Sequence, residues 1–95
     1  MPITRINHFE AKPGAEQALC EFLQSVIATI ENCSGCLGCQ LLLSLDNSAN
    51  IAIVEQWVDV ESHQRAAGAI PPEQLKAAFE FFAKPPSGSY YTSVN

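Results

Sequence analysis

The segment from Ile51 to Val58 constrains the fold most, because it is apolar on both faces when it is read as a strand. One face would carry Ile51, Ile53, Glu55 and Trp57, and the other Ala52, Val54, Gln56 and Val58. A strand of this kind needs a cover on each side of its sheet. A chain of 95 residues has helices for only one side. We therefore expect the other side to be covered by a second copy of the chain.

The remaining patterns predict the order strand, helix, strand, strand, helix, strand. Residues 3–11 alternate, with one face made of Ile3, Arg5, Asn7 and Phe9. An apolar stripe from Leu19 to Ile30 recurs at steps of three and four and predicts a helix that begins near Ala15. Residues 37–45 and 51–58 are expected to pair through a polar loop, and Tyr90 to Val94 to close the sheet.

A second helical region is expected between the third and fourth strands. Asp59 is a typical N-cap for a short helix that runs through His63 to about Ala67, and Gly68 followed by two prolines interrupts it. A further helical piece carries a stripe of Leu75, Ala78, Phe79 and Phe82. The whole order predicts one α+β domain over residues 1–95. Its form is a ferredoxin-like βαββαβ plait, with a four-stranded antiparallel sheet and helices on one face.

The charges exclude several classes of partner. Five basic residues stand against ten acidic ones, giving a net charge of -5, and the basic residues are scattered, so neither nucleic acid nor a membrane surface is expected to bind. The N-terminus lacks the apolar run of a signal peptide. We expect a cytoplasmic chain with reduced thiols. Only 16% of the residues are charged, which favours a homodimer that hides part of the surface.

The cysteines at positions 33, 36 and 39 have the spacing of an iron–sulfur motif. The next ligand of such a motif would stand at position 43, which is Leu43, and Cys20 lies on the preceding helix as a poor fourth ligand. Zinc would lack a ligand in the same way. We expect no metal site, and read this stretch as the junction between helix and sheet.

Three short motifs stand at the ends of the expected strands: Lys12-Pro13-Gly14, Gly35-Cys36-Leu37 and Glu55-Gln56-Trp57-Val58-Asp59. With them the chain resembles the antibiotic biosynthesis monooxygenase-like family of dimeric α/β barrel proteins. The resemblance implies a dimer and an oxygenase without metal or flavin, since relatives oxidise quinols and anthrones with molecular oxygen. Other relatives degrade haem with an Asn, a Trp and a His.

A cofactor-free oxygenation needs a base, a polar group for the substrate oxygen and a dry cavity, which we expect between sheet and helices. Strand parity puts Asn7 and Trp57 on faces that could line one pocket. Ala66 and Ala67 stand where relatives carry their histidine, which argues against haem ligation and removes the usual base. His63 lies one helical turn earlier and is the substitute.

We therefore predict His63 and Asn7 as catalytic residues and a substrate-binding set of Trp57, Glu55, Phe79, Phe82 and Tyr91. Each of these residues could instead have a purely structural role. Glu55 could pair with Arg5 or Lys84, and only one of two adjacent tyrosines can reach a given pocket.

Three functions stay open. The first is a cofactor-independent monooxygenase acting on a small aromatic or quinol-type substrate. The second is a non-enzymatic dimer that holds a small hydrophobic ligand, and the third is a metal or redox protein that uses the cysteines.

Overall fold

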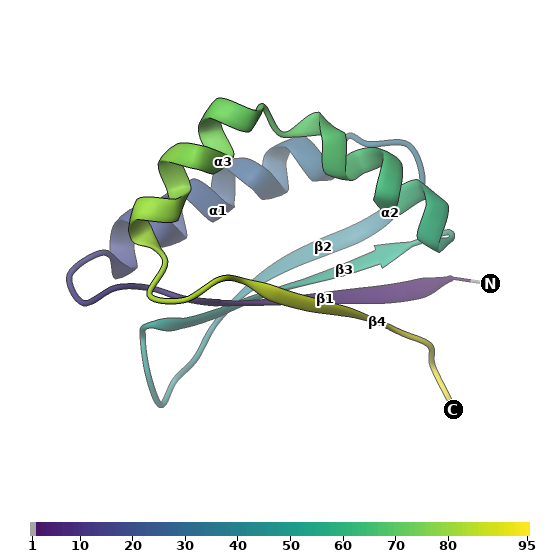
Figure 1. Cartoon of the computed structure of the whole chain (residues 1–95). Coiled ribbons are helices and arrows are strands. Elements are labelled where there is room, and N and C mark those ends of the chain that lie inside the picture. Colours follow the sequence, from purple (N-terminus) through teal and green to yellow (C-terminus); the bar gives the residue numbers. More distant parts are fainter. Residues whose placement is uncertain (1) are drawn as a thin grey trace.

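The protein folds into a four-stranded antiparallel sheet with all its helices on one face (Figure 1). The computed structural model describes residues 2–95, so residue 1 of the predicted domain lies outside it. The elements are β1 Ile3–Glu10, α1 Glu16–Ile30, β2 Cys36–Leu43, β3 Asn50–Trp57, α2 Val60–Ala66, α3 Pro72–Ala78 and β4 Ser87–Tyr91. The strand order is β2-β3-β1-β4. The predicted α+β ferredoxin-like plait is confirmed.

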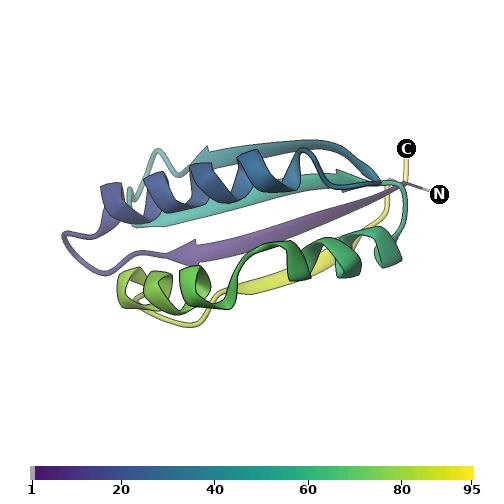
Figure 2. The same cartoon turned by 90° about the horizontal axis from the view of Figure 1, so that it is seen from above.

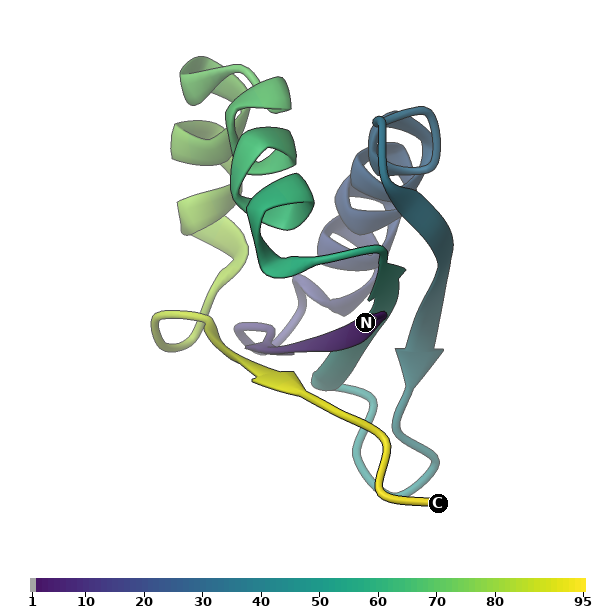
Figure 3. The same cartoon turned by 90° about the vertical axis from the view of Figure 1, so that its right-hand side faces the viewer.

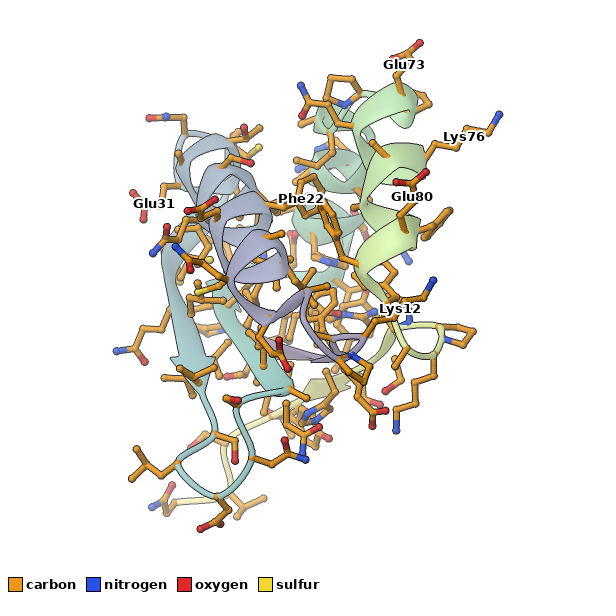
Figure 4. All side chains as sticks on the ribbon, turned by 90° about the vertical axis from the view of Figure 1, so that its left-hand side faces the viewer. Lys12, Phe22, Glu31, Glu73, Lys76 and Glu80 are labelled. Atoms are coloured by element: carbon orange, nitrogen blue, oxygen red, sulfur yellow. The ribbon has the colours of Figure 1, made fainter. Side chains whose placement is uncertain are left out.

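The helices form two groups on the same face of the sheet. Figure 2 shows α1 over the side of β2 and β3, and α2 and α3 over the side of β1 and β4. Figure 3 shows the same two groups of helices viewed from one end. In Figure 4, Phe22 lies between α1 and α3, whereas Glu73 and Lys76 project outward from α3 and Glu80 from the 3-10 turn Phe79–Phe81 that follows it. The apolar stripe of α1 thus faces inward, and the polar side of α3 faces solvent.

Two apolar clusters hold α1 to the sheet. At one end, the buried residues are Ala11, Leu19, Leu23, Ile51 and Ile53. At the other end they are Ile30, Trp57 and Ala66. The clusters meet along β3, where Ile53 belongs to the first and Trp57 to the second. Glu55 stands between them on the same face, so a carboxyl group interrupts an otherwise apolar core.

Gly35 joins α1 to β2 and also touches the start of α2. Its φ of 89° lies in the left-handed region that only glycine adopts without strain. A Cβ at this position would run into the Ser62 hydroxyl and approach the Val58 side chain. The carboxylate of Asp59 accepts a 2.8 Å hydrogen bond from the Ser62 amide, which confirms the predicted N-cap. The helix that carries His63 is therefore fixed at its first turn.

Three sequence predictions differ from the structure. The last strand begins at Ser87 and ends at Tyr91, because it pairs with β1 from His8 to Thr4. A register shift in β2 between Cys36 and Gly38 leaves Leu37 outside the alternation and exposed. The stripe expected on α3 is only partly buried, since Leu75 and Phe79 are exposed whereas Ala78 is buried.

The face of the sheet opposite the helices carries mixed side chains. The apolar ones are Ile6, Leu42, Ala52, Val54 and Tyr91, which stand among Thr4, Gln40, Gln56 and Ser89. Figure 1 shows no helix on this face within the described residues 2–95. Over the same range, no helix is long and apolar enough to span a membrane.

Candidate active site

Glu55 is a buried acid whose two oxygens each accept a hydrogen bond. Its residue is only 1% exposed. The Trp57 indole Nε1 donates to Oε1 at 2.9 Å, and the Asn7 amide Nδ2 donates to Oε2 at 2.9 Å. Residues 55 and 57 lie on one face of β3 because strand side chains alternate, and Arg5 stands directly opposite Glu55 on β1. The strands therefore bring two N–H donors and a cation to one carboxyl group.

Arg5 and Asn7 form the second part of the network. Arg5 Nε donates to Asn7 Oδ1 at 3.0 Å, so the Asn7 amide bonds through both its oxygen and its nitrogen. Gly88 on β4 is the partner of Asn7 across the strand pair. A Cβ at Gly88 would collide with Asn7 Oδ1 and with the Arg5 guanidinium. The absence of a side chain at this position leaves room for the Arg5–Asn7 hydrogen bond.

His63 connects this network to the edge strand β4. Its Nε2 lies 3.8 Å from Glu55 Oε1, and its Nδ1 lies 2.7 Å from the Tyr90 hydroxyl oxygen. The imidazole meets the Trp57 and Tyr90 rings edge-on, with centroid separations of 5.6 and 5.3 Å. The Arg5 guanidinium carbon lies 4.7 Å from the centre of the Tyr90 ring. His63 thus lies between a buried acid and a phenol at the surface.

The surroundings shift the pKa values of both titratable groups at the centre. Burial raises the pKa of Glu55, while the hydrogen bonds from Trp57 and Asn7 and the charge of Arg5 oppose that rise. Burial lowers the pKa of His63, and the nearby Arg5 lowers it further. Both shifts favour a neutral imidazole. A neutral histidine at physiological pH is the form that accepts a proton.

The structure brings four of the predicted site residues into one network: Asn7, Glu55, Trp57 and His63. Trp57 is fully buried and contacts Glu55 rather than a cavity. Of the two cations considered for Glu55, Arg5 lies beside it, whereas Lys84 lies 3.7 Å from Glu10.

The other three predicted site residues lie elsewhere. Phe79 and Phe82 pack against each other, with ring centroids 5.7 Å apart, at the end of α3. Tyr91 pairs with Thr4 on the opposite face of the sheet, so it does not reach His63. Tyr90 is the tyrosine at the site. Its cross-strand partner is Arg5. The alternation of β4 places the two tyrosines on opposite faces, but only this pairing shows that Tyr90 is the one on the side of the helices.

Hollows on the surface of the described residues 2–95 include the following three. One of about 430 Å³ is apolar and lined by Phe79, Phe82 and the loop to Pro86. Another of about 500 Å³ lies on the uncovered side of the sheet around His8, and the third, of about 450 Å³, lies beside Cys33 and Arg65. None of the three is lined by Glu55, His63 or Tyr90. In the described residues 2–95, every buried side-chain nitrogen or oxygen has a hydrogen-bond partner.

All four cysteines are free thiols. Burial raises the pKa of Cys36, and raises that of Cys39 to about 12. No group of three or more metal-binding side chains comes together within the described part of the chain.

Comparison with known proteins identifies the family. The model of the antibiotic biosynthesis monooxygenase family matches residues 2–80. The chain belongs to this family. The family resemblance predicted from the three motifs is thereby confirmed. Among curated proteins, none matches the sequence.

Solved structures of other proteins share the fold. SnoaB, a cofactor-independent oxygenase from Streptomyces nogalater, is 18% identical with a TM-score of 0.83, covering 99% of this chain and 94% of its own. A protein from Mycobacterium tuberculosis is 19% identical with a TM-score of 0.85, covering 100% and 97%. A protein from Pseudomonas aeruginosa is 23% identical with a TM-score of 0.81, covering 98% and 95%. At these identities the likeness concerns the fold.

Proposed function

We propose that this member of the family is a cofactor-independent monooxygenase that oxidises a small aromatic or quinol-type substrate with molecular oxygen. The observation that carries the proposal is the position of His63. It is a half-buried imidazole with a lowered pKa, 3.8 Å from the buried acid Glu55 and 2.7 Å from Tyr90. Such an arrangement suits a general base.

The reaction needs a base because oxygen reacts with the electron-rich anion of the substrate. For an anthrone-type substrate, removal of a proton gives an enolate. One oxygen atom then becomes the new carbonyl oxygen and the other leaves as water, so that CH₂ and O₂ give C=O and H₂O. Substrate and oxygen balance this equation without an external reductant. His63 serves as the proton acceptor, and Arg5 supplies positive charge beside the developing anion.

In this proposal Asn7, Glu55 and Trp57 act on His63 rather than on the substrate. Asn7 and Trp57 hold the two oxygens of Glu55, and Glu55 faces the imidazole. Phe79 and Phe82 line the apolar hollow of about 430 Å³, which is large enough for an aromatic ring system and is a second place where a hydrophobic ligand could bind.

Oxygen uptake tests the function. Protein freed of metal is incubated with an anthrone or a naphthohydroquinone, and oxygen consumption is followed against a blank without protein. We expect His63→Ala to lower kcat by about 10²-fold or more. Gln64→Ala, an exposed change on the same helix, is the matched control. Uptake that is equal in wild type and His63→Ala would remove His63 as the base. Tight binding of the same compounds without turnover would favour the ligand-binding alternative.

We also propose that a second copy covers the uncovered sheet face. The apolar side chains Ile6, Val54 and Leu42 support this, since they would otherwise stay in water. Light scattering at micromolar concentration is expected to give the mass of a dimer, and Val54→Lys is expected to shift the mass toward the monomer. A wild-type protein that stays monomeric would contradict this packing. The cytoplasmic location stays a prediction, which cell fractionation would test.

A further inference from the structure

Solvent exposure increases from Glu55 through His63 to Tyr90. The side chain of Glu55 is 2% exposed and that of His63 is 16% exposed, whereas Tyr90 is 37% exposed as a residue. The three groups come from β3, α2 and β4, and their polar atoms follow one another at 3.8 and 2.7 Å. A molecule that approaches from solvent therefore meets the phenol before it meets the imidazole.

The hydrogen bonds of Glu55 favour one of the two neutral forms of His63. Both oxygens of Glu55 accept N–H donors from Trp57 and Asn7, an environment that suits an acceptor. The His63 nitrogen facing Glu55 Oε1 is Nε2, so a neutral imidazole is favoured with its proton there. Nδ1 is then the unprotonated nitrogen. In this tautomer Nδ1, at 2.7 Å from the hydroxyl oxygen, is the acceptor of the Tyr90 O–H.

We propose that Tyr90 is a catalytic residue that takes the substrate proton and relays it to His63. The substrate hydroxyl or enol gives its proton to the Tyr90 oxygen as the Tyr90 O–H proton moves to His63 Nδ1. The products are the substrate anion, an intact phenol and an imidazolium whose Nε2–H faces Glu55. The charge on Arg5, stacked 4.7 Å from the ring centre, lies close to the new anion. The inference rests on the proposed function for the reaction that the relay serves.

The groups around His63 make the pKa of His63 a test of the proposal. The charged or titratable ones are Glu55 on β3, Arg5 on β1 and Tyr90 on β4, with the thiols of Cys36 and Cys39 on β2 close to Glu55. A donor to Nδ1 stabilises the neutral imidazole, so Tyr90→Phe is expected to raise the pKa of His63. A facing carboxylate stabilises the imidazolium, so Glu55→Gln is expected to lower it.

Nitrogen-15 NMR of histidine-labelled protein tests the relay without any substrate. The expected result is an Nε2–H tautomer of His63 in the wild type, and opposite pKa changes of His63 in Tyr90→Phe and Glu55→Gln. An Nδ1–H tautomer, or a His63 titration that is the same in wild type and Tyr90→Phe, would overturn the proposal. Melting temperatures and circular dichroism of both variants establish that the fold is retained.

Oxygen uptake with an anthrone tests the catalytic step. Tyr90→Phe is expected to lower kcat and kcat/KM together by about 10²-fold. Ser89→Ala removes a hydroxyl from the opposite face of the same strand and is expected to change kcat far less. Loss of turnover in His63→Ala with full turnover in Tyr90→Phe would overturn the relay but keep His63 as the base. A wild type that consumes no oxygen would contradict the proposed function. The NMR result would then test the hydrogen bond from Tyr90 to His63 independently of any reaction.

Discussion

Replacing Gly88 by alanine is expected to break the hydrogen bonds of the Asn7 side chain from a position that has no side chain of its own. The new Cβ would overlap Asn7 Oδ1 and the Arg5 guanidinium. If Asn7 turns away, the Arg5–Asn7 bond is lost, at a cost of about 1 kcal/mol, and so is the bond to Glu55, at a cost of about 1.5–3 kcal/mol. The stiffer unfolded chain offsets about 0.4–1 kcal/mol of this.

The net loss of about 2 kcal/mol in the free energy of unfolding would lower the melting temperature by roughly 8–16 °C in a domain of this size. Chemical denaturation and thermal scans measure both quantities. Gly38→Ala is the matched control, because Gly38 also lies in a strand and a Cβ there meets nothing within 4 Å. Unfolding free energies of the two variants within about 0.5 kcal/mol of each other would refute the reasoning.

Three further predictions follow from the burial and capping of single groups. Because burial raises the pKa of Glu55 above its ordinary 4.5, ionisation of Glu55 removes stability as pH rises from there through the raised pKa, and Glu55→Gln is expected to lack this loss in denaturation measured against pH. The Cys39 thiol, with a pKa of about 12, is expected to react with iodoacetamide at pH 8 much more slowly in the folded than in the unfolded protein, as mass spectrometry would show. Asp59→Ala removes the acceptor for the Ser62 amide and is expected to lower the melting temperature, whereas Asp46→Ala in the hairpin loop is expected to leave it nearly unchanged.

The sequence predicted the sheet because strand alternation is a local property. A period of two gave the sets of residues that share a face on β1 and on β3, Asn7 with Phe9 and Glu55 with Trp57, and the structure turns both faces toward the helices. The Asp59 cap fixed the start of α2 and with it the turn of the helix on which His63 lies. These assignments depend on neighbours within a few residues in the chain.

The remaining features depend on contacts between distant segments. Alternation says that Tyr90 and Tyr91 point to opposite faces, but only the pairing of Tyr90 with Arg5 decides which one faces the helices. The bulge that exposes Leu37 inserts a residue into an otherwise regular pattern, and no local signal marks it. The expected pocket beside Trp57 stays a prediction: the indole is fully buried and bonded to Glu55, and none of the three hollows described above is lined by it.

Gly35 and Ser62 lie close together, although one belongs to the connection between α1 and β2 and the other to the helix that carries His63. Residue 35 ends the connection from α1, and residue 62 lies one position before the proposed base His63. A larger side chain at either position would push the first turn of α2 away from the sheet, and the imidazole would move with it. Positions 35 and 62 are therefore constrained as a pair. Anyone who redesigns this chain for a new substrate should keep both small and vary the outward side of α3 instead, where Glu73 and Lys76 face solvent (Figure 4).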